Sequence, residues 1–151
     1  MIQTRRYYFV IGAVLLGLMP AMASALEYRA VSVPKAILYD APSAQGKKLF
    51  VVGQGYPVEV IVNLGDWIKV RDRQGGLNWI ESKQLTNKRT VIVTADQAEV
   101  RQSGDAAAAI VFRAEKDVVL DLMEPVTNGW AKVHHRDGLI GYVPASSVWG
   151  L

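Results

Sequence analysis

The chain has 151 residues, half of them hydrophobic, with 17 basic and 14 acidic residues and no cysteine. The lack of cysteine excludes a disulfide, a thiol nucleophile and a lipid-modified cysteine anchor. The net charge of +3 falls to +1 once the segment carrying Arg5 and Arg6 is removed. Because phosphate binding depends on clustered positive charge, we expect no nucleic-acid partner.

The first 25 residues have the three parts of a secretory signal. Arg5 and Arg6 give a positive start, residues 7–19 are an uncharged apolar run, and Ala23-Ser24-Ala25 offers small residues for cleavage. The run is shorter than the roughly 20 residues that span a bilayer, which favours cleavage over a membrane anchor. We therefore predict a signal peptide over 1–25, no stable membrane anchor after its removal, and a periplasmic or secreted protein.

Almost every later apolar run alternates as a β-strand does. The strand expected over 58–63 carries three alternating valines on one face. In the next strand, Ile68 and Val70 are expected to face the core, and Trp67 and Lys69 to face outward. These patterns predict an all-β protein.

Turn signals separate the runs. Asn128-Gly129 and Asp137-Gly138 accept a positive φ at low cost and predict tight hairpins. Gly65-Asp66 and residues 74–76 hold the same places earlier in the chain. The alanine-rich run 105–109 has room for one helical turn but is too short for a stable helix.

The chain repeats itself. Residues 65–85 and 128–148 align without a gap at an offset of 63, with five identities in 21 positions, where chance gives roughly one or two. The identical pairs are Trp67/Trp130, Lys69/Lys132, Val70/Val133, Arg73/Arg136 and Gly75/Gly138. This period predicts two copies of one small domain, over 26–86 and 90–151. The short connection between them predicts a fairly fixed pair.

The repeated segments also resemble a known family. The second copy carries Val100-Arg101, Asn128–Val133, Asp137-Gly138 and Gly141–Val143; the first carries Leu38-Tyr39, Gly65–Val70, Gly75 and Trp79-Ile80. In order and spacing, these motifs are similar to the bacterial SH3-like domain. The resemblance implies two tandem small SH3-like β-barrels of five to six strands each, behind a signal peptide.

Aromatic and basic residues on the outward faces of the strands are the candidate ligand-binding residues. They are Tyr39, Trp67, Lys69, Trp79, Arg101, Trp130, Lys132 and Tyr142. Exposed aromatic side chains give large contact area, and the basic groups can pair with peptide carboxylates. The alternative is that the aromatic residues pack over loop edges or cover the barrel ends.

The sequence offers little support for catalysis or metal binding. His134 and His135 are the only histidines. Neighbours on a strand point to opposite faces, so the two are poorly placed to share one metal, even with Asp137 nearby. No cysteine, glycine-rich phosphate loop or paired carboxylate signature is present. We therefore expect no cofactor, no metal and no catalytic residues.

These observations favour a non-enzymatic exported binding module of the cell envelope. Its expected partner is a cell-wall (peptidoglycan) peptide or an envelope protein. The alternatives are a structural scaffold for another periplasmic protein, without cell-wall affinity, and a cryptic hydrolase that uses His134 or His135.

Overall fold

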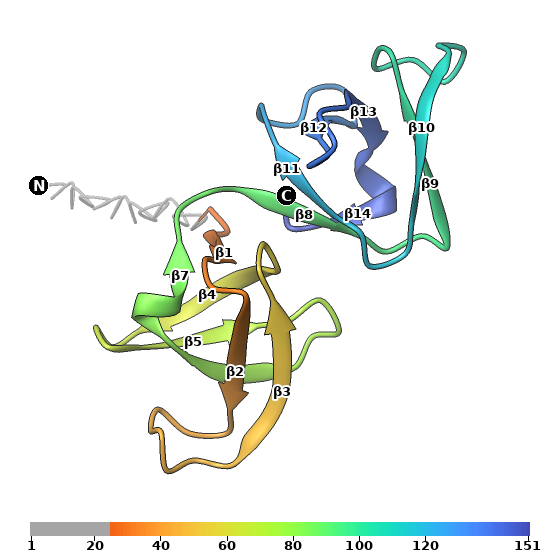
Figure 1. Cartoon of the computed structure of the whole chain (residues 1–151). Coiled ribbons are helices and arrows are strands. Elements are labelled where there is room, and N and C mark those ends of the chain that lie inside the picture. The colour runs from red at the N-terminus through yellow and green to blue at the C-terminus, as the bar shows by residue number, and fades with distance from the viewer. Residues whose placement is uncertain (1–24) are drawn as a thin grey trace, which may run out of the picture.

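The computed structural model describes residues 25–151, so all of the expected signal peptide except Ala25 lies outside the described residues. The described chain forms two seven-stranded antiparallel sheets, which confirms the all-β prediction (Figure 1). No helix in residues 25–151 has the length and apolar character required to cross a membrane.

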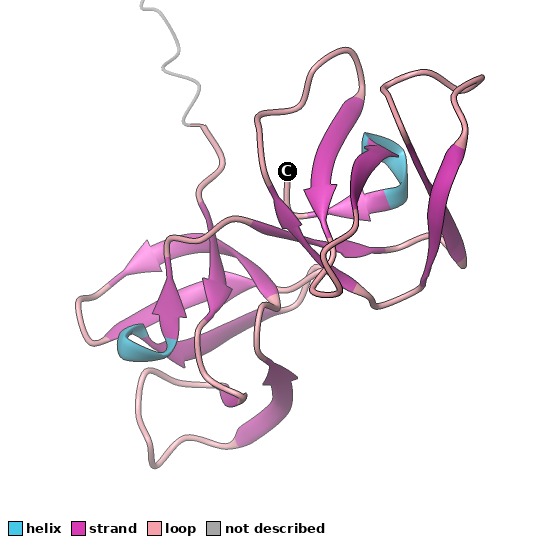
Figure 2. Cartoon of the chain, turned by 45° about the horizontal axis from the view of Figure 1, so that its top comes forward, coloured by secondary structure: helices cyan, strands magenta, loops and turns pink. Residues whose placement is uncertain are grey.

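The first sheet contains β1 (Tyr28–Val31), β2 (Lys35–Tyr39), β3 (Lys48–Gly53), β4 (Pro57–Asn63), β5 (Trp67–Arg71), β6 (Leu77–Glu81) and β7 (Leu85–Thr86). The second contains β8 (Thr90–Val93), β9 (Gln97–Arg101), β10 (Ile110–Glu115), β11 (Val119–Leu122), β12 (Trp130–His134), β13 (Ile140–Pro144) and β14 (Val148–Trp149). A 3-10 turn precedes the last strand of each sheet: η1 (Ser82–Gln84) and η2 (Ala145–Ser147) (Figure 2).

The two sheets have the same topology. Their strand orders are β3-β2-β6-β5-β4-β1-β7 and β10-β9-β13-β12-β11-β8-β14, so each strand of the first sheet has one equivalent in the second. The registers agree as well: Trp67 lies across from Glu81, and Trp130 lies across from Pro144. The repeat detected in the sequence is therefore a repeat of structure.

Each sheet encloses its own apolar core, built by the alternation of its strands. Ile68 and Val70 are fully buried in the first core, as predicted, while Trp67 and Lys69 on the opposite face are half-buried. The first core also contains Val31, Ala36, Leu38, Val58 and Ile80. The second contains Val91, Val93, Ala98, Val100, Ala114, Leu120, Ala131, Val133, Val143 and Val148.

The alternation expected over 58–63 is only partly correct. Val58 is buried, but Val62 is 41% exposed. The register of β4 against β5 shifts between Val60 and Val62, which marks a bulge that turns the end of the strand away from the core. Glu59 is buried instead, and its carboxylate accepts two hydrogen bonds from the Arg71 guanidinium, at 3.2 and 2.9 Å.

The predicted turns form where glycine is required. Asn128 and Gly129 both have positive φ, 51° and 79°, in a two-residue hairpin closed by reciprocal bonds between Thr127 and Trp130. Gly75 and Gly138, with φ of 89° and 91°, end equivalent hairpins in the two sheets. The alanine-rich run 105–109 forms a turn rather than a helix, in which the Ala107 and Ala108 N–H groups donate to Asp105.

Direct contacts join the two sheets, which lie at opposite ends of the view in Figure 1. The Thr90 hydroxyl donates to the Gly55 carbonyl at 2.6 Å, and the Tyr28 ring meets the Trp149 ring edge-on at 5.3 Å. Arg73 forms a 2.5 Å ion pair with Asp117. These contacts restrict how the two sheets can move relative to each other.

Two phenols, the buried Tyr28 and the half-buried Tyr56, make the free energy of unfolding depend on alkaline pH. Burial raises the pKa of both tyrosines above the ordinary 10.0. For Tyr28, the nearby Glu59 carboxylate raises the pKa further, as a smaller cause. As the pH rises, these tyrosines lose their protons in the unfolded protein before they do so in the folded one. The stabilisation that comes from the raised pKa values is therefore complete below about pH 10 and is lost above it. We expect urea denaturation to show this fall between about pH 9 and 11. Tyr56→Phe should make the fall smaller; an unchanged slope would contradict the assignment.

Candidate functional site

Four of the predicted residues meet on the outward face of the first sheet. Tyr39 on β2 lies across from Trp79 on β6, and Trp79 lies across from Lys69 on β5, so the three form one row over neighbouring strands. The Lys69 ammonium lies over the Trp79 ring, 5.8 Å from its centroid. Trp67, two residues from Lys69, meets the Tyr39 ring edge-on at 5.4 Å. We call these four residues the aromatic row.

The second sheet repeats the row with different side chains. Arg101 lies across from Tyr142, which lies across from Lys132. The Lys132 ammonium is 6.0 Å from the Tyr142 ring centroid, the same arrangement as in the first sheet. Arg101 takes the place of Tyr39, so the second row has one fewer aromatic ring and one more cation.

The charges of the two rows are satisfied differently. Lys132 pairs with Glu124 at 2.8 Å, and this hydrogen bond raises the pKa of the lysine. Arg101 donates to the Ala108 carbonyl at 2.7 Å and pairs with Glu99. Lys69 has no carboxylate partner within residues 25–151. The first row therefore presents a cation that is available to a ligand, and the second presents cations bound within the protein.

The two tryptophans that begin β5 and β12 are half-buried and also have a structural role. Trp67 packs against Tyr39, which is 6% exposed. Trp130 packs against the β9–β10 loop, where a Cβ placed on Gly104 would lie only 3.1 Å from the indole. Both predicted roles, ligand contact and loop cover, are therefore compatible with the geometry.

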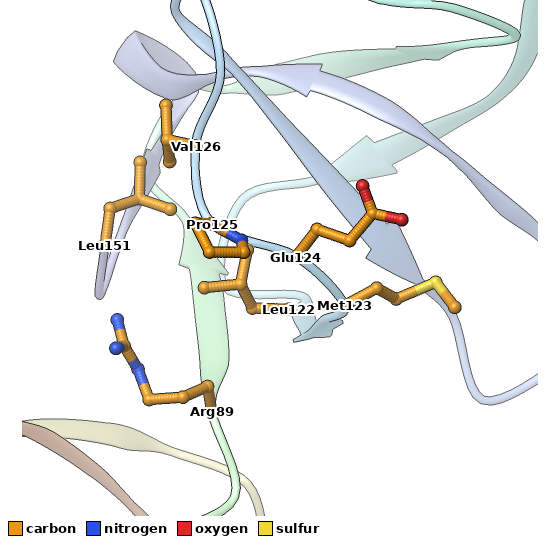
Figure 3. Close-up of a pocket in the computed structure, with 7 residues that line it drawn as sticks. All are labelled: Arg89, Leu122, Met123, Glu124, Pro125, Val126 and Leu151. Carbon is orange, nitrogen blue, oxygen red and sulfur yellow. The ribbon is translucent and has the colours of Figure 1, made fainter.

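A groove that the sequence did not indicate lies beside the second sheet (Figure 3). Its volume is about 500 Å³, and its lining residues are Arg89, Leu122, Met123, Glu124, Pro125, Val126 and Leu151. The Arg89 guanidinium donates to the Gly150 carbonyl at 2.8 Å, while its buried Nε has no hydrogen-bond partner. Five of the seven lining residues are apolar, so the groove suits an apolar group. Its walls come from the connection between the sheets, the end of β11, the loop that follows β11 and Leu151, which share no sequence pattern.

Both histidines line a polar cleft of about 680 Å³ between the two sheets, although opposite faces were expected. His135 follows the last residue of β12, so the alternation of the strand no longer applies to it. Each ring lies near its own acid: His134 is 3.5 Å from Asp121 and His135 is 3.2 Å from Asp137. Lys88 also pairs with Asp121, at 2.9 Å.

The two histidines of the cleft are not arranged as a catalytic triad or as part of a metal-ligand cluster. Within residues 25–151, neither imidazole makes a hydrogen bond to a hydroxyl group. The same residues contain no group of three or more histidine, aspartate or glutamate side chains that could hold a metal ion. A histidine beside an acid, with no hydroxyl in hydrogen-bond contact, falls short of a triad.

Several solved structures are similar to the chain. NlpC2 from Trichomonas vaginalis is 14% identical, with a TM-score of 0.38 over 83% of this chain and 48% of that one. NlpC1 from the same organism is 14% identical, with a TM-score of 0.38 over 91% and 50%. An NlpC/P60 family protein from Bacillus cereus ATCC 10987 is 17% identical, with a TM-score of 0.38 over 81% and 55%. The chain spans about half the length of each.

The search of curated proteins found no match. The model of the bacterial SH3 domain, in contrast, matches the chain twice, over residues 32–87 and 94–150. Each match contains one of the two sheets from its second strand onward. The chain therefore belongs to the bacterial SH3 domain family and carries two tandem copies of that domain.

Proposed function

We propose that this protein is an exported, non-enzymatic binding module of the cell envelope, and that its ligand is a peptide that carries a carboxylate. The binding units are the domains over 26–86 and 90–151. The ligand is a peptidoglycan peptide or a segment of an envelope protein. The observation that carries the proposal is the lysine lying over an aromatic ring at the same register position in both copies.

The aromatic row of the first domain is the principal contact. A ring that lies beneath an ammonium group favours the charged form and holds it in one direction. Since Lys69 has no acidic partner in the described part of the chain, a ligand carboxylate can pair with it without displacing an internal bond. Trp79 and Trp67 supply flat apolar area beside the charge, as binding hot spots commonly do.

The second row is the weaker contact in this proposal. A ligand carboxylate would have to compete with Glu124 for Lys132 and with Glu99 for Arg101. Exchange of one carboxylate for another gains little free energy in water. The proposal therefore assigns the larger share of the binding energy to Trp67, Lys69 and Trp79, with the buried Tyr39 supporting Trp67. The smaller share goes to Arg101, Trp130, Lys132 and Tyr142.

Co-sedimentation with purified peptidoglycan sacculi tests the cell-wall branch. We expect Lys69→Glu and Trp79→Thr each to weaken binding by about tenfold or more, as loss of a central contact does. Lys132→Glu should have a smaller effect. Lys116→Glu, an exposed lysine away from both rows, makes the same charge change and should leave binding unchanged.

Two outcomes would redirect the proposal. If the protein stays in the supernatant with sacculi at every salt concentration, the cell-wall branch is wrong, and cross-linking in a periplasmic extract then tests the envelope-protein branch. If Lys132→Glu abolishes binding and Lys69→Glu does not, the assignment of the first row is wrong.

Variants of the two histidines in the cleft test the proposal that the protein is not a hydrolase. His134→Ala and His135→Ala should leave binding to sacculi unchanged, because neither side chain belongs to a row. Release of soluble peptide fragments from sacculi by the unaltered protein, lost in these variants, would establish the hydrolase instead.

A further inference from the structure

The outermost strand of the first domain, β3, leaves one edge open. It stands at the end of its sheet and pairs only with β2. No strand in residues 25–151 pairs with its other side, and both views show that side at the outside of the domain (Figures 1 and 2). An open edge presents a row of N–H and C=O groups that can accept a further strand.

The side chains on this edge are apolar and unusually exposed. Leu49, Phe50 and Val51 are 37%, 53% and 65% exposed, and they follow one another directly in the chain. Natural proteins commonly protect a free edge with charges, prolines or bulges because such an edge otherwise pairs with other chains. On β3 such devices lie only at the start of the strand, where Lys48 is charged and the register shifts beside Tyr39.

The equivalent strand of the second domain, β10, is protected. Arg113 on β10 lies across from Glu99 and pairs with it at 3.4 Å. The corresponding pair in the first domain is Val51 across from Ile37. Glu115 ends β10 where Gly53 ends β3. The equivalent edge strands thus differ: β10 of the second domain carries charged side chains, and β3 of the first domain carries apolar ones.

The phenylalanine shared by the two strands shows the same difference. Phe112 packs against the second core, and its ring lies 5.7 Å from that of His135. Phe50, at the equivalent position, is 53% exposed and outside the first core. Asp72 stands where the second domain has His135, and it is directed to Asn78 and to nearby backbone N–H groups. The first domain therefore leaves Phe50 uncovered.

The lysines near the two ends of β3 indicate which kind of segment binds its free edge. Lys48 begins β3, and Lys35 lies across from Gly53 at the other end. Lys35, Lys47 and Lys48 form no ion pair within residues 25–151. The nearby Asp40 carboxylate accepts the Lys47 backbone N–H at 2.8 Å. Both ends of the edge are therefore basic, which favours a strand with acidic ends.

The same charges oppose a second copy of this chain. In a two-fold antiparallel pair centred on Phe50 and Val51, Lys48 of one copy would lie across from Gly53 of the other. Lys35 already lies beside that Gly53, so each end of the pair would bring two lysines into one row. The two lysines would be two strand spacings apart, about 10 Å, where their repulsion is modest but still favours an acidic partner over a second copy.

We propose that the free edge of β3 binds an extended segment of a partner protein by strand addition. The segment has apolar side chains that pack on Phe50 and Val51, and aspartate or glutamate residues near its ends that pair with Lys35 and Lys48. This surface uses backbone groups and side chains that the aromatic row does not use, so the two proposals can fail separately.

The test uses the described chain, without the predicted signal peptide, and a synthetic peptide. The probe is acetyl-Glu-Val-Thr-Val-Thr-Val-Glu-amide with a fluorescent label, whose binding is measured by anisotropy. One control replaces both glutamates by lysine, and another carries N-methyl groups on alternate amides. We expect the glutamate peptide to bind at least tenfold more tightly than either control. Amide NMR shifts should concentrate on residues 48–53 of the protein.

Protein variants test the edge itself. Ile37→Glu with Val51→Arg places the charged pair of the second domain on the first, and Val51→Arg alone is a milder change. Both should weaken peptide binding at least tenfold while leaving sacculus binding unchanged. Leu64→Arg, at another exposed apolar position, should bind the peptide normally.

Three results would overturn the proposal. They are equal affinity for the glutamate and lysine peptides, NMR shifts confined to other strands, and a dimer in sedimentation that Val51→Arg dissolves, which would identify a second copy as the occupant.

Discussion

Replacement of Ile68 by alanine is expected to lower the free energy of unfolding by about 2–5 kcal/mol, the usual loss for a large side chain removed from a packed core. Ile68 is fully buried, with 0% exposure, in the first core. The substitution removes apolar contact and leaves a cavity that rigid antiparallel strands fill poorly. Urea denaturation followed by circular dichroism measures the loss.

Val62→Ala is the matched control for this change. Val62 is 41% exposed on the preceding strand, and its truncation should alter the free energy of unfolding by no more than about 0.5 kcal/mol. A loss below about 1 kcal/mol for Ile68→Ala would contradict the separate first core. The number of transitions in the curve also shows whether the two domains unfold together.

The sequence predicted the cores well because alternation is a local property. Ile68 and Val70 face inward in the first domain, and Ala131 and Val133 do so in the second, as the pattern of each strand requires. The repeat at a fixed offset predicted that whatever one half formed, the other would form too. The shared strand order confirms this. Local pattern and internal repetition together accounted for the fold class.

The sequence could not predict features that depend on pairing between distant strands. The bulge that exposes Val62 arises from the register of β4 against β5, which hydrophobicity does not specify. The burial of Glu59 follows from its ion pair with Arg71 across the same two strands. A carboxylate in an alternating pattern reads as exposed until its partner is known.

The candidate site, too, was predictable only where it depends on local sequence pattern. The residue types on the outward face were identified, but their grouping depended on β2 pairing with β6, which joins Tyr39 to Trp79. The difference between Lys69 and Lys132 depended on Glu124, which belongs to a loop. The groove beside Arg89 could not be predicted because the residues that line it come together only when the second domain closes.

Gly150→Ala is expected to cause the second large loss of stability, through strain and crowding together. Gly150 has φ of 115°, a region that side chains with a Cβ rarely adopt. An added Cβ would lie 2.8 Å from the Thr90 carbonyl oxygen and 3.2 Å from the Pro57 Cβ, and Pro57 belongs to the first domain. The methyl group would therefore push on the backbone of one domain and on a side chain of the other.

Gly138→Ala separates the two causes. Gly138 has a similar φ, 91°, but an added Cβ meets nothing within 4 Å, so this variant should lose only the strain, about 1–2 kcal/mol. Gly150→Ala should lose about 1–3 kcal/mol more, the usual cost of overpacking. Urea denaturation followed by tryptophan fluorescence measures both losses, since Trp149 meets Tyr28 across the same junction. Equal losses in the two variants would show that the contact between the two domains moves apart at no cost. The prediction of a fixed pair of domains would then be wrong.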